Sequence, residues 1–117
     1  MARLKLAVLI SGRGSNLQAL IEACQDPAYP AEIVLVLANE PDALGLERAK
    51  AANIPTRVVD HRDFSDRPAF EAALTTAIET AGARLVCLAG FMRLLGEGFV
   101  RRWRDRLINI HPSLLPA

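Results

Sequence analysis

KLAVLIS, residues 5–11, is a short apolar run that ends at Gly12, and this stretch decides the fold. An apolar run of this length without polar alternation is typical of a strand buried on both faces, as in parallel sheets. Residues 16–23 then carry apolar side chains at helical spacing, and Ser15 or Asn16 is expected to cap that helix. The apolar positions of the helix are Leu17, Leu20 and Ile21. A buried strand followed directly by an amphipathic helix indicates an α/β protein.

The alternation of apolar runs and amphipathic segments continues along the whole chain. Strands are expected near 5–11, 32–38, 55–59, 85–89 and 107–111, and helices at 16–23, 43–52, 67–81 and 97–103. Unbroken alternation of this kind is typical of a mainly parallel sheet with right-handed crossovers and helices on both faces. We therefore predict a doubly wound, Rossmann-like α/β fold in a single domain that spans 1–117.

The composition argues against several classes of protein. The chain has 117 residues, 51% of them hydrophobic and 23% charged, which suits a globular domain with one core. A net charge of +1 disfavours nucleic acid or an anionic membrane as partner. Because the sequence has no apolar run of membrane-spanning length and no signal-peptide pattern, we expect a cytoplasmic location. Cys24 and Cys87 form no CxxC pair, so both are expected to be reduced packing residues, and no metal is expected.

The loop after the first strand has the composition of an anion site. Parallel sheets bind ligands at the carboxyl edge of their strands, and residues 11–16 (SGRGSN) leave the sheet there. Glycines allow close backbone approach, and the next helix presents unpaired N–H groups to a phosphate. Leu17 replaces the last glycine of the dinucleotide fingerprint, and the P-loop lysine is absent. The alternative is an ordinary strand-to-helix turn capped by Ser15, and the extra donor of Asn16 favours the anion site.

The loops after the last two strands add apolar and catalytic side chains to this edge. Phe91, Met92 and Leu94 either fill the core or line a slot for a flat ring, and Arg93 between them needs an acidic partner or an anionic ligand.

In the last strand, Asn109 and His111 lie on the same face because side chains alternate. An amide donor beside a titratable base suits acyl transfer, although a solitary histidine is more often structural. The G-x-S-x-G pattern of a nucleophilic serine does not surround Ser113, so the sequence favours interpreting Ser113 as a hydroxyl in a turn.

Three motifs together resemble a known family. They are Gly12 with Gly14-Ser15-Asn16, then AGFMR at 89–93, then NIHPSLLP at 109–116. In this order and spacing they resemble the phosphoribosylglycinamide formyltransferases, also called glycinamide ribonucleotide transformylases, among the folate-dependent formyltransferases. The last motif also marks methionyl-tRNA formyltransferases, so it indicates the chemistry and not the substrate. The Gly-Ser-Asn loop discriminates between them.

The resemblance implies transfer of a formyl group from the cosubstrate 10-formyltetrahydrofolate to the amine of glycinamide ribonucleotide, in purine synthesis. It implies catalytic roles for Asn109 and His111, and a ribose-phosphate site at Gly14, Ser15 and Asn16. The residues that it places around the folate are Arg67, Phe91, Met92, Arg93, Leu95, Val100, Leu107 and Asn109. The implied partners are small molecules, and homo-oligomer formation stays open.

The chain departs from the family pattern at its carboxyl end. The family's catalytic aspartate lies beyond the Pro-Ser-Leu-Leu-Pro turn, while this sequence stops at Ala117, and neither Asp60 nor Asp105 matches that position. We therefore expect an amino-terminal portion of an enzyme, with little activity alone because its imidazole lacks a carboxylate partner. The alternatives are another folate-dependent formyltransferase or a formyltetrahydrofolate hydrolase, or a noncatalytic phosphate-binding domain.

Overall fold

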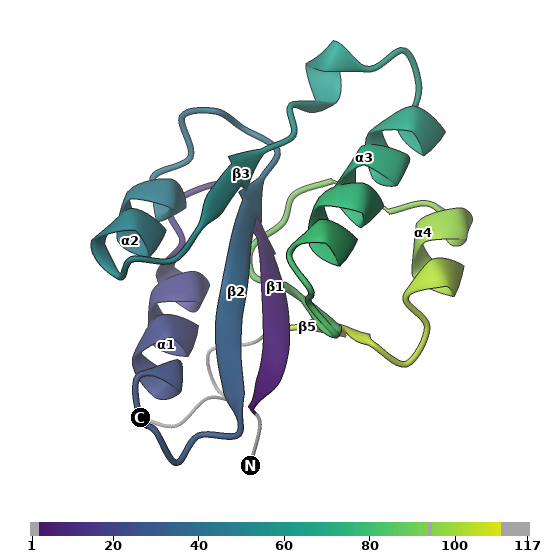
Figure 1. Ribbon diagram of the computed structural model, residues 1–117. Coiled ribbons are helices and arrows are strands. Elements are labelled where there is room, and N and C mark those ends of the chain that lie inside the picture. The colour runs from purple at the N-terminus through teal and green to yellow at the C-terminus, as the bar shows by residue number, and fades with distance from the viewer. Residues whose placement is uncertain (1–2, 94, 111–117) are drawn as a thin grey trace.

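The computed structural model describes residues 3–93 and 95–110, in which strands and helices alternate (Figure 1). The strands are β1 (Leu4–Ile10), β2 (Ala31–Ala38), β3 (Thr56–Val58), β4 (Leu85–Leu88) and β5 (Leu107–Asn109). The helices are α1 (Ser15–Cys24), α2 (Gly45–Ala51), α3 (Arg67–Thr80) and α4 (Glu97–Arg102), with a 3-10 turn at His61–Asp63. In the described part of the chain, no helix is long and apolar enough to cross a membrane.

The five strands form one parallel sheet in the order β3-β2-β1-β4-β5. From β1 the chain builds outward through β2 to β3, and then returns to the other side of β1 to add β4 and β5. The direction of winding therefore reverses between β1 and β4. In sheets of this kind the carboxyl ends of the two strands at the reversal splay apart and leave room for a ligand.

Both faces of the sheet carry helices, as predicted. Figure 1 shows α1 and α2 on one side and α3 and α4 on the other. Leu6, Val8 and Ile10 of β1 belong to the core beneath α1 and α2. Ala7 and Leu9 belong to the core beneath α3 and α4. The run from residue 6 to residue 10 is thus buried on both faces, which confirms the interpretation of KLAVLIS as an interior strand.

Several predicted boundaries move by one or two residues, and one predicted cap is wrong. Gly14 occupies the cap position of α1 with φ of 79°, no side chain caps the helix, and Ser15 is already its first residue. A left-handed cap residue costs glycine little, so the chain enters the helix without a serine or asparagine cap. The predicted strand 107–111 is confirmed only as Leu107–Asn109. His111 lies outside the described residues.

The two cysteines pack as predicted. Both are free, Cys87 is buried and Cys24 is half-buried. Burial raises the pKa of the Cys87 thiol to about 12, and burial also raises the pKa of Cys24. Because the thiolate is the reactive form, neither side chain is suited to nucleophilic chemistry near neutral pH.

Candidate functional site

The loops that follow β1, β4 and β5 meet at one edge of the sheet. The backbone N–H of Met92, after β4, donates to the Ser11 hydroxyl oxygen, after β1, at 2.8 Å. The Asn16 side-chain amide, on α1, donates to the Ile110 carbonyl, directly after β5, at 3.4 Å. Segments more than eighty residues apart in sequence are therefore joined at the point where the winding reverses. For the described residues of these loops, of which Ile110 is the last, the predicted convergence is confirmed.

A pocket of about 280 Å³ lies where the first two of these loops meet. This pocket, here called the β1–β4 pocket, is lined by Ser11, Gly12, Arg13, Gly14, Ser15, Asn16, Ala89, Gly90 and Met92. The three residues expected to hold a phosphate thus share a pocket with one residue expected to contact folate. The amino-terminal end of the ten-residue helix α1 opens here, where N–H groups without helical partners and the helix dipole favour an anion.

The glycine loop is held in place by α2. The Gly45 N–H donates to the Gly12 carbonyl at 2.9 Å, and the Arg48 side chain donates to the Arg13 carbonyl at 2.8 Å. Gly14 approaches α2 so closely that an added Cβ would lie 2.6 Å from the Gly45 Cα. The glycine is therefore required twice, by its positive φ and by the approach of two backbones.

The Gly14→Ala variant is expected to lower the free energy of unfolding by about 3 kcal/mol. Roughly 1–2 kcal/mol arises from a left-handed alanine and the rest from overpacking against Gly45. Gly82→Ala is the matched control, because Gly82 has the same φ of 79° with open space around its Cα. The free energy of unfolding of Gly82→Ala should fall only by the conformational part. Urea unfolding of both variants measures the difference. Equal losses would contradict the close approach.

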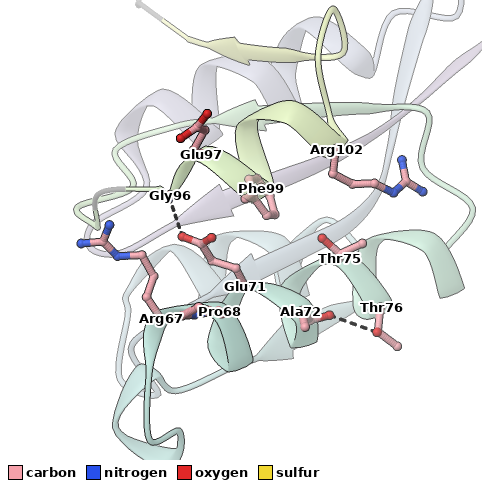
Figure 2. Close-up of a pocket in the computed structure, with 11 residues that line it drawn as sticks. Arg67, Pro68, Glu71, Ala72, Thr75, Thr76, Gly96, Glu97, Phe99 and Arg102 are labelled. Carbon is pink, nitrogen blue, oxygen red and sulfur yellow. Dashed lines mark hydrogen bonds between the residues drawn. The ribbon is translucent and has the colours of Figure 1, made fainter.

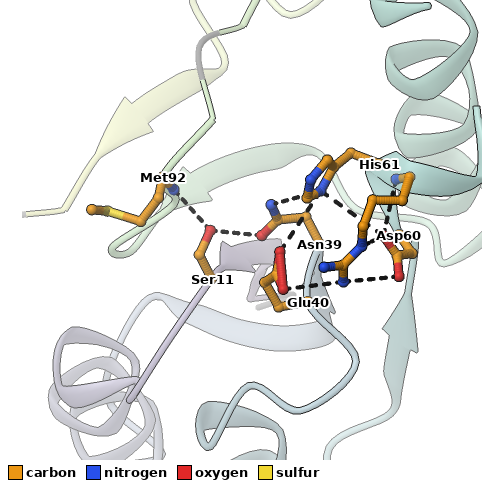
Figure 3. A network of polar contacts seen from close by, with 7 residues as sticks. Ser11, Asn39, Glu40, Asp60, His61 and Met92 are labelled. Atoms are coloured by element: carbon orange, nitrogen blue, oxygen red, sulfur yellow. Dashed lines mark hydrogen bonds and ion pairs between the residues drawn. The ribbon is translucent and has the colours of Figure 1, made fainter.

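A buried asparagine that the sequence analysis did not single out links three strand ends (Figure 3). The Ser11 hydroxyl donates to the Asn39 side-chain oxygen at 2.6 Å, while it accepts the Met92 N–H. Asn39 follows β2 and is 2% exposed. Its amide nitrogen lies 3.5 Å from Nδ1 of His61, after β3. The sequence could have indicated Asn39, because a polar residue directly after a buried strand lies at the carboxyl edge of the sheet.

Charged residues surround the far end of this network. Nδ1 of His61 lies 3.8 Å from a Glu40 carboxylate oxygen and 4.0 Å from one of Asp60. Arg62 pairs with both carboxylates. Hydrogen bonds from the Arg62 side chain and backbone hold the pKa of Asp60 below its usual value. Asp60 is therefore engaged by its own neighbour, Arg62.

The apolar residues expected around the folate fall into two groups. Phe91, Leu95 and Leu107 are partly buried against the core beneath α3 and α4. Met92 is 80% exposed and Val100 46% exposed. Of the residues for which core packing was the alternative, Phe91 thus packs partly against the core, while Met92 leaves apolar surface available to a ligand, as does Val100.

Two of the residues expected around the folate line separate cavities. Arg67, the first residue of α3, lines a cavity of about 790 Å³ between α3 and α4 (Figure 2). This cavity shares no lining residue with the β1–β4 pocket, which contains Met92. Arg93 is exposed and makes no ion pair with any described residue. The described residues expected around the folate are therefore not gathered in either of these two pockets.

Asn109 ends β5 at the carboxyl edge of the sheet. It pairs with Leu88 of β4 and its side chain is exposed. The following residue, Ile110, donates its N–H to the Leu88 carbonyl and accepts from Asn16. The candidate oxyanion donor therefore sits beside the first turn of α1, at the same rim as the glycine loop.

Comparison with known proteins decides the family. The model of the family described as Formyl transferase matches residues 4–117. The chain belongs to this family. The trifunctional purine biosynthetic protein adenosine-3 of Drosophila pseudoobscura pseudoobscura is 58% identical over 97% of this chain and 8% of that protein. The phosphoribosylglycinamide formyltransferase of Haemophilus influenzae is 44% identical over 96% of this chain and 53% of that protein.

Solved structures of family members share the fold. The phosphoribosylglycinamide formyltransferase of Brucella melitensis superimposes with a TM-score of 0.90 at 43% identity, over 94% of this chain and 57% of that one. The Coxiella burnetii formyltransferase gives a TM-score of 0.89 at 46% identity, over 94% of this chain and 52% of that one. This formyl transferase chain therefore spans about half the length of its bacterial relatives.

Proposed function

We propose that the protein to which this chain belongs transfers a formyl group from 10-formyltetrahydrofolate to the amine of glycinamide ribonucleotide, a step of purine synthesis. The observation that carries the proposal is the junction of the glycine loop with the ends of β4 and β5, through Met92 and Ile110. It brings an anion-binding helix terminus next to the strand that carries Asn109. The phosphate anchor then holds the ribonucleotide, and the oxyanion donor faces the formyl group that the amine of the ribonucleotide attacks.

The phosphate of the substrate binds at the β1–β4 pocket in this proposal. Gly14, Ser15 and Asn16 lie at the start of α1 and line this pocket, and N–H groups in the first turn of a helix suit a phosphate. The Asn16 side chain contributes less than the sequence suggested, because it already donates to Ile110. The backbone and Ser15 hydroxyl carry most of the anion binding.

The formyl transfer itself proceeds at the end of β5. The substrate amine attacks the formyl carbon, a new C–N bond forms, and the bond from that carbon to the folate nitrogen breaks. The side-chain N–H of Asn109 donates to the oxygen that becomes negative in the tetrahedral intermediate. His111, which lies outside the described residues, moves the proton from the incoming amine towards the departing folate nitrogen. No step requires a metal ion.

The formyl donor lies along the segment after β4. Arg93 is exposed and suits the anionic parts of a folate, while Met92 and Val100 offer apolar surface to its ring system. Phe91, Leu95 and Leu107 support this surface from the core side. Arg67 on α3 faces the folate tail. A cytoplasmic location fits the two free cysteines and the metabolic roles named for the relatives.

The test is a formyl-transfer assay on the complete gene product with three acceptors. Glycinamide ribonucleotide is expected to accept the formyl group, while methionyl-tRNA and water are not. Formylation of methionyl-tRNA, or release of formate without any acceptor, would assign one of the alternative activities. The 117-residue chain assayed alone is expected to show little turnover. Phosphate-ligand binding without turnover in the complete gene product would leave only a noncatalytic domain.

A further inference from the structure

A carboxylate outside the expected site is buried against the segment that follows β4. Among the described residues, Asn39 and Glu71 are the polar or charged residues that are buried, and Glu71 is 7% exposed. Figure 2 shows the Glu71 side chain extending from α3 towards the backbone of Gly96, whose N–H donates to it at 2.6 Å. A buried carboxylate without partners would cost several kcal/mol, and the short charge-assisted bond from Gly96 offsets part of that cost.

The bond completes the start of α4. Gly96 is the cap residue of α4 and has no side chain to satisfy the helix terminus. In a capping box, a glutamate from the same helix accepts the N–H of the cap residue. Here Glu71 supplies that carboxylate from another helix, so the start of α4 is fixed to α3.

The contact is closely fitted. A Cβ added to Gly96 would lie 3.1 Å from the Glu71 Oε1 atom and 3.3 Å from Cδ of Arg67. The stem of Arg67, one turn before Glu71 on α3, therefore also lies against Gly96. Glu71 and Arg67 thus both lie against the side of Gly96 where a Cβ would point.

The rest of α4 is held by separate contacts. The Trp103 indole donates to the Thr75 hydroxyl oxygen at 3.3 Å, and Arg102 pairs with Glu79. These contacts lie one and two turns further along α3. Loss of the Glu71 bond should therefore free the start of α4 and leave its end in place.

The segment from Met92 to Gly96 is thus fastened at two points. Its first N–H donates to Ser11 and its last to Glu71. Under the proposed function, this segment carries residues that contact the formyl donor. We propose that Glu71 is a positioning residue for that donor: it fixes Gly96, against which the stem of Arg67 also lies, and so sets the shape of the folate side of the site. This inference rests on the proposed function.

The test compares Glu71→Ala with Glu71→Gln and with Glu79→Ala in the complete gene product. Glu71→Ala is expected to raise KM for 10-formyltetrahydrofolate about tenfold, with KM for glycinamide ribonucleotide unchanged. Glu71→Gln keeps an oxygen acceptor of the same reach and is expected to restore most of the loss. Glu79→Ala is the matched control on the same helix face, and both KM values should stay unchanged.

Hydrogen exchange gives a readout that does not depend on activity. The Gly96 amide should lose protection in Glu71→Ala and keep it in Glu79→Ala. A lower melting temperature in Glu71→Ala with unchanged KM for the folate would overturn the inference and leave Glu71 a structural residue. Unchanged Gly96 protection would overturn it as well. Absence of formyl transfer in the unmutated protein would instead overturn the proposed function, and this inference with it.

Discussion

Replacing Asn109 with alanine in the complete gene product is expected to lower kcat about 10²- to 10³-fold, because removal of one oxyanion donor typically costs that much. Asn109 ends β5 with an exposed side chain. Truncation of an exposed side chain at a strand end should change the free energy of unfolding by no more than about 0.5 kcal/mol. The loss of rate should therefore appear in a folded protein, in steady-state kinetics with both substrates.

The Asn109→Asp variant distinguishes the effect of hydrogen-bond donation by the side chain from the effect of its size and shape. Aspartate has nearly the same size but offers no N–H and adds a negative charge next to the developing oxyanion, so its kcat should fall further than that of the alanine variant. Binding of a phosphate-bearing substrate should hold in both variants, because the glycine loop is untouched. If affinity falls while kcat holds, Asn109 is a binding residue and the oxyanion role is wrong.

The order of elements was predictable because it follows from local patterns. The apolar run at 5–11 and the helical spacing of Leu17, Leu20 and Ile21 each require only neighbouring residues, and all were confirmed. Once strands and helices alternate, crossover handedness leaves few topologies. The convergence of the loops after β1, β4 and β5 then follows, since parallel strands end at one edge.

Contacts between distant segments were not predictable in the same way. Whether Gly14 needs its missing side chain depends on the position of Gly45, and the role of Glu71 depends on Gly96, twenty-five residues away. The cap of α1 was predicted wrongly because Gly14, in a left-handed conformation, takes the cap position and Ser15 is already the first residue of the helix. Asn39 was overlooked although it directly follows a predicted strand. A search for polar residues after each strand would have found it.

The Ser15→Asp variant should stabilise the folded protein and weaken its binding of the ribonucleotide substrate. Ser15 is the exposed first residue of α1, whose first turn has no acidic residue. An aspartate there complements the helix dipole and should raise the free energy of unfolding by about 0.3–1 kcal/mol. The same carboxylate would face the substrate phosphate. At 4 Å two unit charges repel by about 4 kcal/mol at an effective dielectric constant of 20.

Because the β1–β4 pocket is open to solvent, we expect about half of that repulsion. This corresponds to a rise of roughly 30-fold in KM for glycinamide ribonucleotide. KM for the formyl donor should stay unchanged, and added salt should shrink the difference because the repulsion is screened. Ser15→Asn is the neutral control of the same size as aspartate and should change KM far less. A more stable variant with an unaltered KM for the ribonucleotide would remove the phosphate from this helix terminus, since no other effect of the carboxylate would cancel the repulsion.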